Sequence, residues 1–111
     1  MGTRAATSYG HRMPTLHSDH AISDLTVWRG AFDPLQDVRR QAGVLHEQVR
    51  QPVGDPHRIV VDLEFDTVAN AEAFLEFLVN HIWATPANAP ALVGSPTAVI
   101  LDTVLAHDLR E

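Results

Sequence analysis

The sequence has no cysteine, few basic residues and no long hydrophobic run. Without cysteine the chain cannot form a disulfide scaffold, bind zinc through thiolates or use a cysteine nucleophile. Eight Lys and Arg stand against 14 Asp and Glu, a formal net charge of -6. Because phosphate binding needs clustered cations, this balance argues against nucleic acid as a partner. The one dense basic spot, Arg39 and Arg40, is interpreted as an exposed helix face.

Signals for membranes and export are missing as well. No apolar run approaches the roughly 20 residues that span a bilayer. The first twelve residues lack the hydrophobic region of a secretory signal, and Ala6 occupies the position at which myristoylation requires Ser or Thr. We therefore expect a soluble, cytoplasmic protein without a membrane partner.

The composition that remains is typical of one globular domain. The chain has 111 residues, of which 45% are hydrophobic and 20% charged. We predict a ferredoxin-like domain over residues 14–105, an N-terminal tail over 1–13 and a C-terminal tail over 106–111. A flexible tail is the simpler interpretation of residues 1–13; an upstream extension with Met13 as the start, or an arm lying on a partner subunit, is the alternative.

Alternating apolar and polar residues predict four strands. The alternation is clearest from Arg58 to Phe65, where Val60, Asp62 and Glu64 point away from the apolar side. It is weakest in the first strand, which is polar on both faces. The strands are expected at residues 15–21, 44–51, 58–65 and 97–104.

Two helices are predicted between these strands. Ser23 or Asp24 caps the first, which shows an apolar stripe at spacings of three and four. Pro34 breaks the stripe, so we expect a kink or restart at Asp33 and an end at Gly43. The second helix is expected from a cap at residue 66 to about residue 82. Three prolines and a glycine predict a loop over residues 85–96.

The order strand, helix, strand, strand, helix, strand predicts a ferredoxin-like α+β fold. Its four-stranded antiparallel sheet would carry both helices on one face. The other face is expected to be half apolar, and a half-apolar face in a small domain is a candidate interface. Two such sheets packed face to face would form a homodimeric α/β barrel. The apolar residues assigned to this face are Val60, Ala98, Ile100 and Val104, beside Asp102.

Three stretches resemble a known superfamily, the dimeric α/β-barrel proteins that include the antibiotic biosynthesis monooxygenases. They are HAISDLTVW (residues 20–28), RRQAGVLHEQV (39–49) and DPHRIVVDLEFDTVANAEAFL (55–75). The resemblance implies active sites in the cavity between sheet and helices. It also implies activities that range from cofactor-free oxygenases acting on aromatic polyketides to isomerases and haem-degrading enzymes, so the fold alone names no reaction.

Two polar residues are the candidate catalytic pair. His20 ends the first strand, where a neutral imidazole would take a proton from a phenol or enol near pH 7. Asp62 lies in the middle of the third strand and would either orient His20 or act as the base itself. The simpler alternatives are a hydrogen-bonded structural histidine and a salt bridge from Asp62 to Arg50 or Arg58.

A hydrophobic or aromatic substrate would need an apolar wall. The predicted substrate-binding residues are Trp28, Phe32 and Trp83, together with His46 and His81. Trp83 also forms a cluster with Asn80 and His81 that resembles the residues of haem-degrading relatives. Those relatives carry the Asn on the first strand, where this chain has none, so a haem site is not predicted.

No cofactor and no metal are predicted. The histidines lack metal-ligand spacing, and the sequence has neither a phosphate-binding loop nor a nucleophile elbow. The first hypothesis is thus a small homodimeric, cofactor-free monooxygenase or isomerase acting on a hydrophobic small molecule. The second is a non-catalytic dimer that binds a small ligand or a protein partner.

Overall fold

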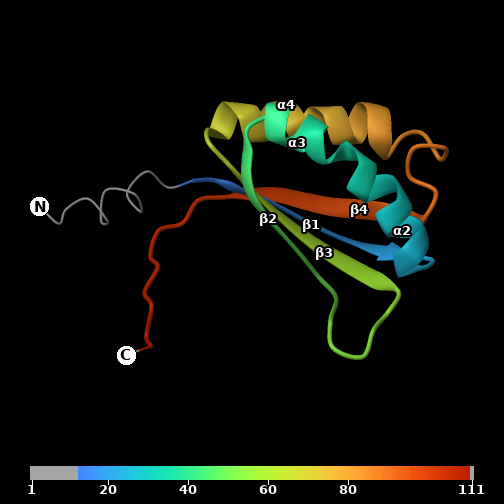
Figure 1. Cartoon of the computed structure of the whole chain (residues 1–111), viewed down its shortest axis with the longest axis horizontal. Helices are drawn as coiled ribbons and strands as arrows, with labels where there is room; N and C mark the ends of the chain where they lie inside the picture. The colour runs from blue at the N-terminus through green and yellow to red at the C-terminus, as the bar shows by residue number, and fades with distance from the viewer. Residues whose placement is uncertain (1–12, 111) are drawn as a thin grey trace, which may run out of the picture.

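A computed structural model describes residues 13–110. Residues 1–12 of the predicted N-terminal tail lie outside this range. Figure 1 shows a sheet with helices on one side. The elements are β1 (Thr15–Ile22), α2 (Leu25–Phe32), a 3-10 turn η1 (Asp33–Leu35), α3 (Gln36–Gln41), β2 (Val44–Arg50), β3 (Arg58–Phe65), α4 (Val68–Phe77), a π-helical turn η2 (Leu78–Ile82) and β4 (Leu92–Leu101).

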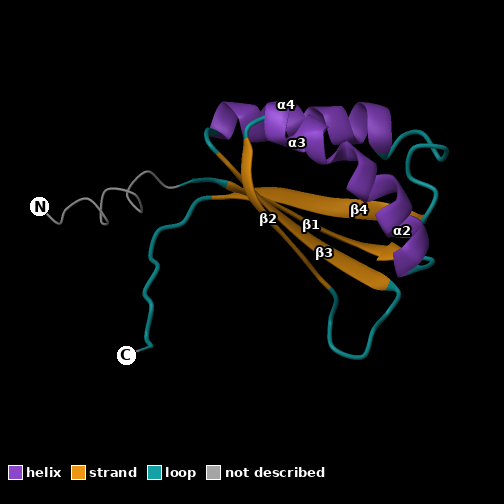
Figure 2. Cartoon of the chain, viewed as in Figure 1, coloured by secondary structure: helices purple, strands orange, loops and turns teal. Residues whose placement is uncertain are grey.

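The four strands form one antiparallel sheet in the order β2-β3-β1-β4. All three α-helices lie over the same face, and no helix in residues 13–110 covers the other face (Figure 2). This arrangement confirms the predicted α+β, ferredoxin-like fold. The sheet of the single chain is open rather than closed into a barrel, so the two-sheet barrel stays a prediction.

The pairing register of the two central strands, β1 and β3, determines which side chains lie on each face of the sheet. In β1 and β3, Leu16 lies opposite Leu63 and His20 lies opposite Ile59, and all four side chains are buried beneath the helices. His17 lies opposite Asp62 on the uncovered face. Because side chains alternate along a strand, His17 and His20 are on opposite sides of the sheet.

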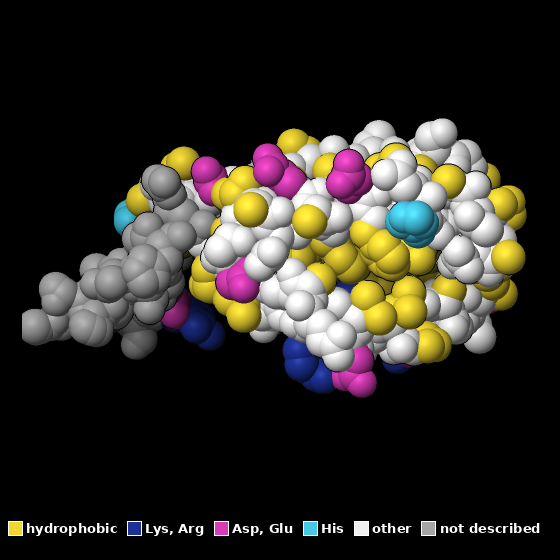
Figure 3. Space-filling model, turned by 90° about the horizontal axis from the view of Figure 1, so that it is seen from above, with side chains coloured by type: hydrophobic (Ala, Val, Ile, Leu, Met, Phe, Trp, Pro, Cys, Tyr) yellow, Lys and Arg dark blue, Asp and Glu magenta, His cyan; other side chains and the backbone are white. Residues whose placement is uncertain are grey.

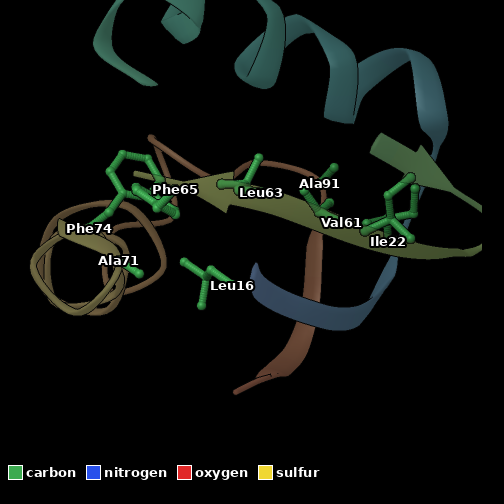
Figure 4. Close-up of a cluster of buried hydrophobic side chains, with 9 residues drawn as sticks. Leu16, Ile22, Val61, Leu63, Phe65, Ala71, Phe74 and Ala91 are labelled. Atoms are coloured by element: carbon green, nitrogen blue, oxygen red, sulfur yellow. The ribbon is translucent and has the colours of Figure 1, made fainter. Parts of the chain in front are cut away.

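The core lies between the sheet and the helices (Figure 4). Phe65 is fully buried, and its ring centre is 5.7 Å from that of Phe74 on α4. Burial of this apolar surface is the main stabilising contribution to the fold. The buried hydrophobic side chains are Leu16, Ile22, Ile59, Val61, Leu63, Phe65, Ala71, Phe74 and Ala91.

The first helical segment follows its sequence signals. The Asp24 carboxylate caps α2 by accepting a hydrogen bond from the Val27 amide, and the helix restarts at Asp33 as predicted. Gly43 ends the segment with φ of +107°, where a Cβ would lie 2.5 Å from the Asp66 carboxylate. The cap of α4 is Thr67 and not Asp66, because the Thr67 hydroxyl accepts from a helix amide.

Strand β4 differs from its prediction in both extent and phase. It begins at Leu92, so part of the predicted loop, including Pro96, belongs to the strand. Proline is tolerated because β4 is an edge strand. The assignment of Ala98 and Ile100 to the uncovered face is wrong, since both pack against the core; Val99 is one of the residues that lie there instead. Val104 and Asp102 lie beyond the end of the strand.

No helix within residues 13–110 is long and apolar enough to cross a membrane.

Candidate functional site

A cavity of about 90 Å³ lies between the sheet and the helices. Figure 3 looks down on the helices and shows hydrophobic side chains gathered in a hollow between them. Trp28, Phe32 and Trp83 belong to its wall, as the sequence predicts. Among residues 13–110, the charged, imidazole, hydroxyl and amide side chains that line it are those of Ser18, His20, Arg39 and Asn88. The cavity is thus an apolar space with few polar groups, the usual composition of a small-molecule site.

His20 projects from β1 into this cavity. It is only 5% exposed, its ring meets Trp83 edge-on at 6.0 Å between centres, and its Nδ1 has no hydrogen-bond partner within residues 13–110. Burial lowers the pKa of His20 below its ordinary value of 6.5, although the neighbouring Asp19 opposes the shift. The imidazole is therefore neutral at pH 7.

A bulge in the sheet accompanies His20. Its neighbours Asp19 and Ala21 pair with Thr97 and Val93 of β4, so the three residues 94–96 lie opposite the single residue His20. Gly94, with φ of +74°, provides the conformation that this irregularity requires. Bulges of this kind bend a strand and are frequent beside functional sites.

The aromatic wall comes from two helical segments. Trp28 and Phe32, four residues apart on α2, stack with 4.4 Å between ring centres and 19° between planes. Trp83 follows the π-helical turn η2, and its amide donates to the carbonyl of Leu78 at 2.7 Å. Trp83, directly after the π turn, lines the cavity, and π turns recur at functional sites.

Arg39 is the site residue that the sequence interpretation missed. Only 4% of it is exposed, so the prediction of an exposed helix face is wrong for Arg39, although it holds for Arg40. The guanidinium lies 3.6 Å from the centre of the Phe32 ring and is paired with Glu47 of β2. The signal available in the sequence was the helical spacing, because Arg39 follows Phe32 and Leu35 at steps of three and four.

Asp62 does not reach this cavity. It lies on the uncovered face, where its Oδ1 is 2.6 Å from His17 Nδ1 and its Oδ2 is 3.5 Å from an Arg50 nitrogen. The predicted pairing of Asp62 with His20 is therefore wrong, because β1 and β3 place the two side chains on opposite faces of the sheet. The alternative salt bridge to Arg50 is present. Arg58 instead pairs with Asp19 at 2.8 Å.

Two other predicted substrate-binding residues also lie outside the cavity. His46 is exposed on β2, opposite Glu64. His81 is exposed on η2, with its ring centre 5.7 Å from that of Phe77. Its carbonyl nevertheless accepts a hydrogen bond from Asn88, which does line the cavity. His81 thus supports the wall through its backbone.

No group of three or more His, Asp or Glu side chains in the described part of the chain is placed to hold a metal ion.

Comparison with known proteins gives matches of structure only. No family model matches the sequence, and no curated protein matches it. A monooxygenase of Streptomyces coelicolor, solved in complex with nanaomycin D, is 12% identical; the match covers 91% of this chain and 96% of that one, with a TM-score of 0.66. A putative antibiotic biosynthesis monooxygenase of Nitrosomonas europaea is 18% identical, with coverage of 84% and 100% and a TM-score of 0.62.

A third match is a dimeric ferredoxin-like protein from an uncultured marine organism. It is 14% identical, covers 85% of this chain and 97% of its own, and has a TM-score of 0.58. At such identities the likeness is one of fold. The chain therefore has the fold shared by antibiotic biosynthesis monooxygenase-like and dimeric ferredoxin-like proteins, which confirms the resemblance seen in the sequence at that level.

Proposed function

We propose that this protein is a homodimer that binds a hydrophobic or aromatic small molecule in the cavity and acts on it as a cofactor-free monooxygenase or isomerase. One observation carries the proposal: a buried, neutral His20, whose Nδ1 has no partner within residues 13–110, faces a cavity with a mostly apolar lining. A buried polar atom without a partner costs about 1–3 kcal/mol. A ligand with a phenol or enol hydroxyl would remove that cost.

The chemistry follows from the state of His20. A neutral imidazole accepts a proton, and the ligand becomes a phenolate or enolate anion. Such an anion is rich in electrons. It either adds molecular oxygen at a carbon to give a hydroperoxide, which loses water and leaves one oxygen atom on the ligand as a ketone, or it takes a proton back at a carbon. The first outcome is oxygenation and the second is isomerisation. Trp28, Phe32 and Trp83 would hold the flat ring of the ligand against the imidazole.

The structural neighbours support the class of ligand. The Streptomyces coelicolor monooxygenase is solved with nanaomycin D, and other matches are antibiotic biosynthesis monooxygenases. The apolar lining of the present cavity suits the hydrophobic or aromatic small molecule proposed as the ligand.

A non-catalytic binding protein is the second candidate. Within residues 13–110, His20 and Arg39 are the only ionisable side chains in the cavity lining, and Arg39 is paired with Glu47. The lining therefore offers a base but no obvious general acid. In this alternative the aromatic residues bind a ligand or a partner and His20 only hydrogen-bonds to it.

The uncovered face of the sheet supports the homodimer. It combines the apolar side chains of Val60, Val99 and Leu101 with the His17–Asp62 and Arg58–Asp19 pairs. Two of the structural matches are dimeric ferredoxin-like proteins. Packing two such faces together would cover the apolar residues and close the predicted eight-stranded barrel.

Proton abstraction is the step to test. With 2-tetralone, an enolisable aromatic ketone, the wild-type protein should accelerate exchange of the C1 protons for deuterium, followed by NMR. The His20→Gln variant should lose about 100-fold or more of the acceleration, the usual contribution of a general base. The Asp62→Asn variant is the matched control and should retain the rate, because Asp62 lies on the other face.

The result would also separate the two candidates. Equal exchange rates for wild type and His20→Gln would contradict the catalytic proposal. Binding of 2-tetralone to the wild type, seen as a change in tryptophan fluorescence, without any acceleration would establish the non-catalytic alternative instead.

A further inference from the structure

The cavity wall contains a buried cation that an apolar ligand would not need. Arg39 is 4% exposed, lines the cavity and has its guanidinium carbon 3.6 Å from the centre of the Phe32 ring. Removing a guanidinium from water is costly unless hydrogen bonds and an opposite charge compensate it. The way in which Arg39 is compensated therefore indicates what else it can bind.

The compensation of Arg39 is incomplete. Its Nε donates to Glu47 Oε1 at 2.6 Å, and a terminal nitrogen donates to Glu47 Oε2 at 3.2 Å. The other terminal nitrogen donates to the Phe32 carbonyl at 2.7 Å. A guanidinium has five N–H groups, so these three bonds leave two without a partner among residues 13–110. The bonded groups hold the guanidinium in one orientation.

A purely structural role would be to fasten α3 to β2. The Arg39–Glu47 pair does join these elements. However, a buried salt bridge is often no more stabilising than apolar side chains of similar volume, and apolar side chains would suit this wall. A structural pair also does not require the guanidinium to line the cavity and to stack on an aromatic ring of the same wall.

We propose that Arg39 makes the cavity selective for aromatic acids, whose carboxylate or phenolate oxygen accepts hydrogen bonds from the two unused N–H groups. The inference rests on the proposed function in that it uses the same cavity, and it narrows the class of ligand. Arginine is suited to the task because its planar fork matches the geometry of a carboxylate. The ring of the ligand would pack on the aromatic wall.

Glu47 would set the strength of this selectivity. Its carboxylate balances the charge of Arg39 in the empty cavity and opposes an incoming anion. Its side chain is 27% exposed, against 5% for that of Arg39, so the cation is the more buried partner. Removing the charge of Glu47 should therefore strengthen the binding of an anion, whereas a fastening role predicts no gain.

The test compares benzoate with benzamide, two probes of nearly the same shape that differ in charge. Binding is followed by tryptophan fluorescence and by NMR shifts at Arg39 and Trp83. Wild type should bind benzoate at least 10-fold more tightly than benzamide. Arg39→Gln should weaken benzoate binding at least 10-fold more than benzamide binding and so abolish this preference, Arg39→Lys should retain part of it, and Glu47→Gln should increase it.

Circular dichroism and thermal unfolding check that each variant folds. If Arg39→Gln does not fold, Arg39→Lys and Glu47→Gln decide the question, since the first keeps the charge and the second keeps the arginine. Equal affinities of wild type for the two probes, or a Glu47→Gln variant that binds benzoate more weakly, would overturn the proposal and leave the cavity as a site for neutral ligands. Failure of the wild type to bind either probe would overturn the proposed ligand site itself.

Discussion

The two faces of the sheet carry polar groups in different ways. On the face beneath the helices, His20 is buried without a partner for its Nδ1. On the uncovered face, His17, only three residues away, is about one-third exposed and bonded to Asp62. Residues of one type on one strand thus have opposite environments, because side chains alternate along a strand.

This difference indicates on which face a polar group would gain more free energy from binding a ligand. A polar group on the uncovered face has water or an ion partner, so its free energy changes little when a ligand approaches. A buried polar atom that has neither, as His20 Nδ1 among residues 13–110, gains more from a ligand that supplies a hydrogen bond. The proposed site therefore lies on the covered face, although the open face carries more charges.

The largest expected effect is on stability. Phe65→Ala, at a fully buried position on the covered face, should lower the free energy of unfolding by about 3–5 kcal/mol. Val99→Ala on the uncovered face, where the side chain is 48% exposed, should lower it by about 1 kcal/mol or less. Urea unfolding followed by circular dichroism measures both, and similar losses would contradict the assignment of the core.

A smaller effect is expected on association. Val60→Lys places a charge in the middle of the uncovered face, on β3 between Asp19 of β1 and Arg50 of β2. If two such faces pack together, the dissociation constant of the dimer should rise at least 10-fold, which is about 1.4 kcal/mol. Sedimentation velocity across a concentration series measures it. A wild-type protein that is monomeric at micromolar concentration would contradict the barrel.

The smallest expected effect is on the pH dependence of stability. Burial lowers the pKa of His20 in the folded chain, so the unfolded chain binds a proton more readily. The stability contributed by the neutral imidazole is full above pH 6.5 and is lost as the pH falls towards the folded pKa. Between pH 7.5 and 5.5, His20→Gln should therefore lose stability less steeply than wild type.

The matched control for this measurement is His107→Gln, at an exposed position after the last strand. It should leave the slope unchanged. The same slope for His20→Gln and wild type would contradict the burial of a neutral imidazole at position 20, and an NMR titration of the His20 ring provides an independent reading of its pKa.

Much of the fold was predictable because its signals are local. The strand Arg58–Phe65 alternates strictly and was predicted at its observed bounds. The restart at Asp33 follows from Pro34, whose ring fixes φ, and the end at Gly43 follows from the ability of glycine to adopt a positive φ without strain. The aromatic wall was also predictable, since Trp28 and Phe32 share one side of a helix.

The relations between strands were less predictable. The first strand is polar on both faces, so its sequence does not show which face His20 takes, and the pairing with Asp62 followed from that ambiguity. In β4 both sets of alternate residues are apolar, with Ala98 and Ile100 on one side and Val99 on the other. Its phase was therefore undetermined without the register against β1.

Charged residues gave the least reliable signal. Arg39 lies in a segment rich in polar side chains, and such residues are exposed in most proteins. Its burial is compensated by Glu47, eight residues later on β2, and no spacing rule links a helix residue to a strand residue across such a connection. Only the tertiary structure brings the pair to the cavity.

The π-helical turn at Leu78–Ile82 has a consequence for how sequences of this fold are aligned. A π turn holds one residue more than the α-helical turn it replaces, and each helical residue accounts for about 100° of rotation. An ungapped alignment with a chain that is α-helical throughout would thus pair Trp83 with a residue on another side of the helix. The direction of the Trp83 indole ring therefore depends on the extra residue of the π turn as well as on the tryptophan itself. Deleting one residue from this turn would rotate the ring away from the cavity, even with Trp83 still present.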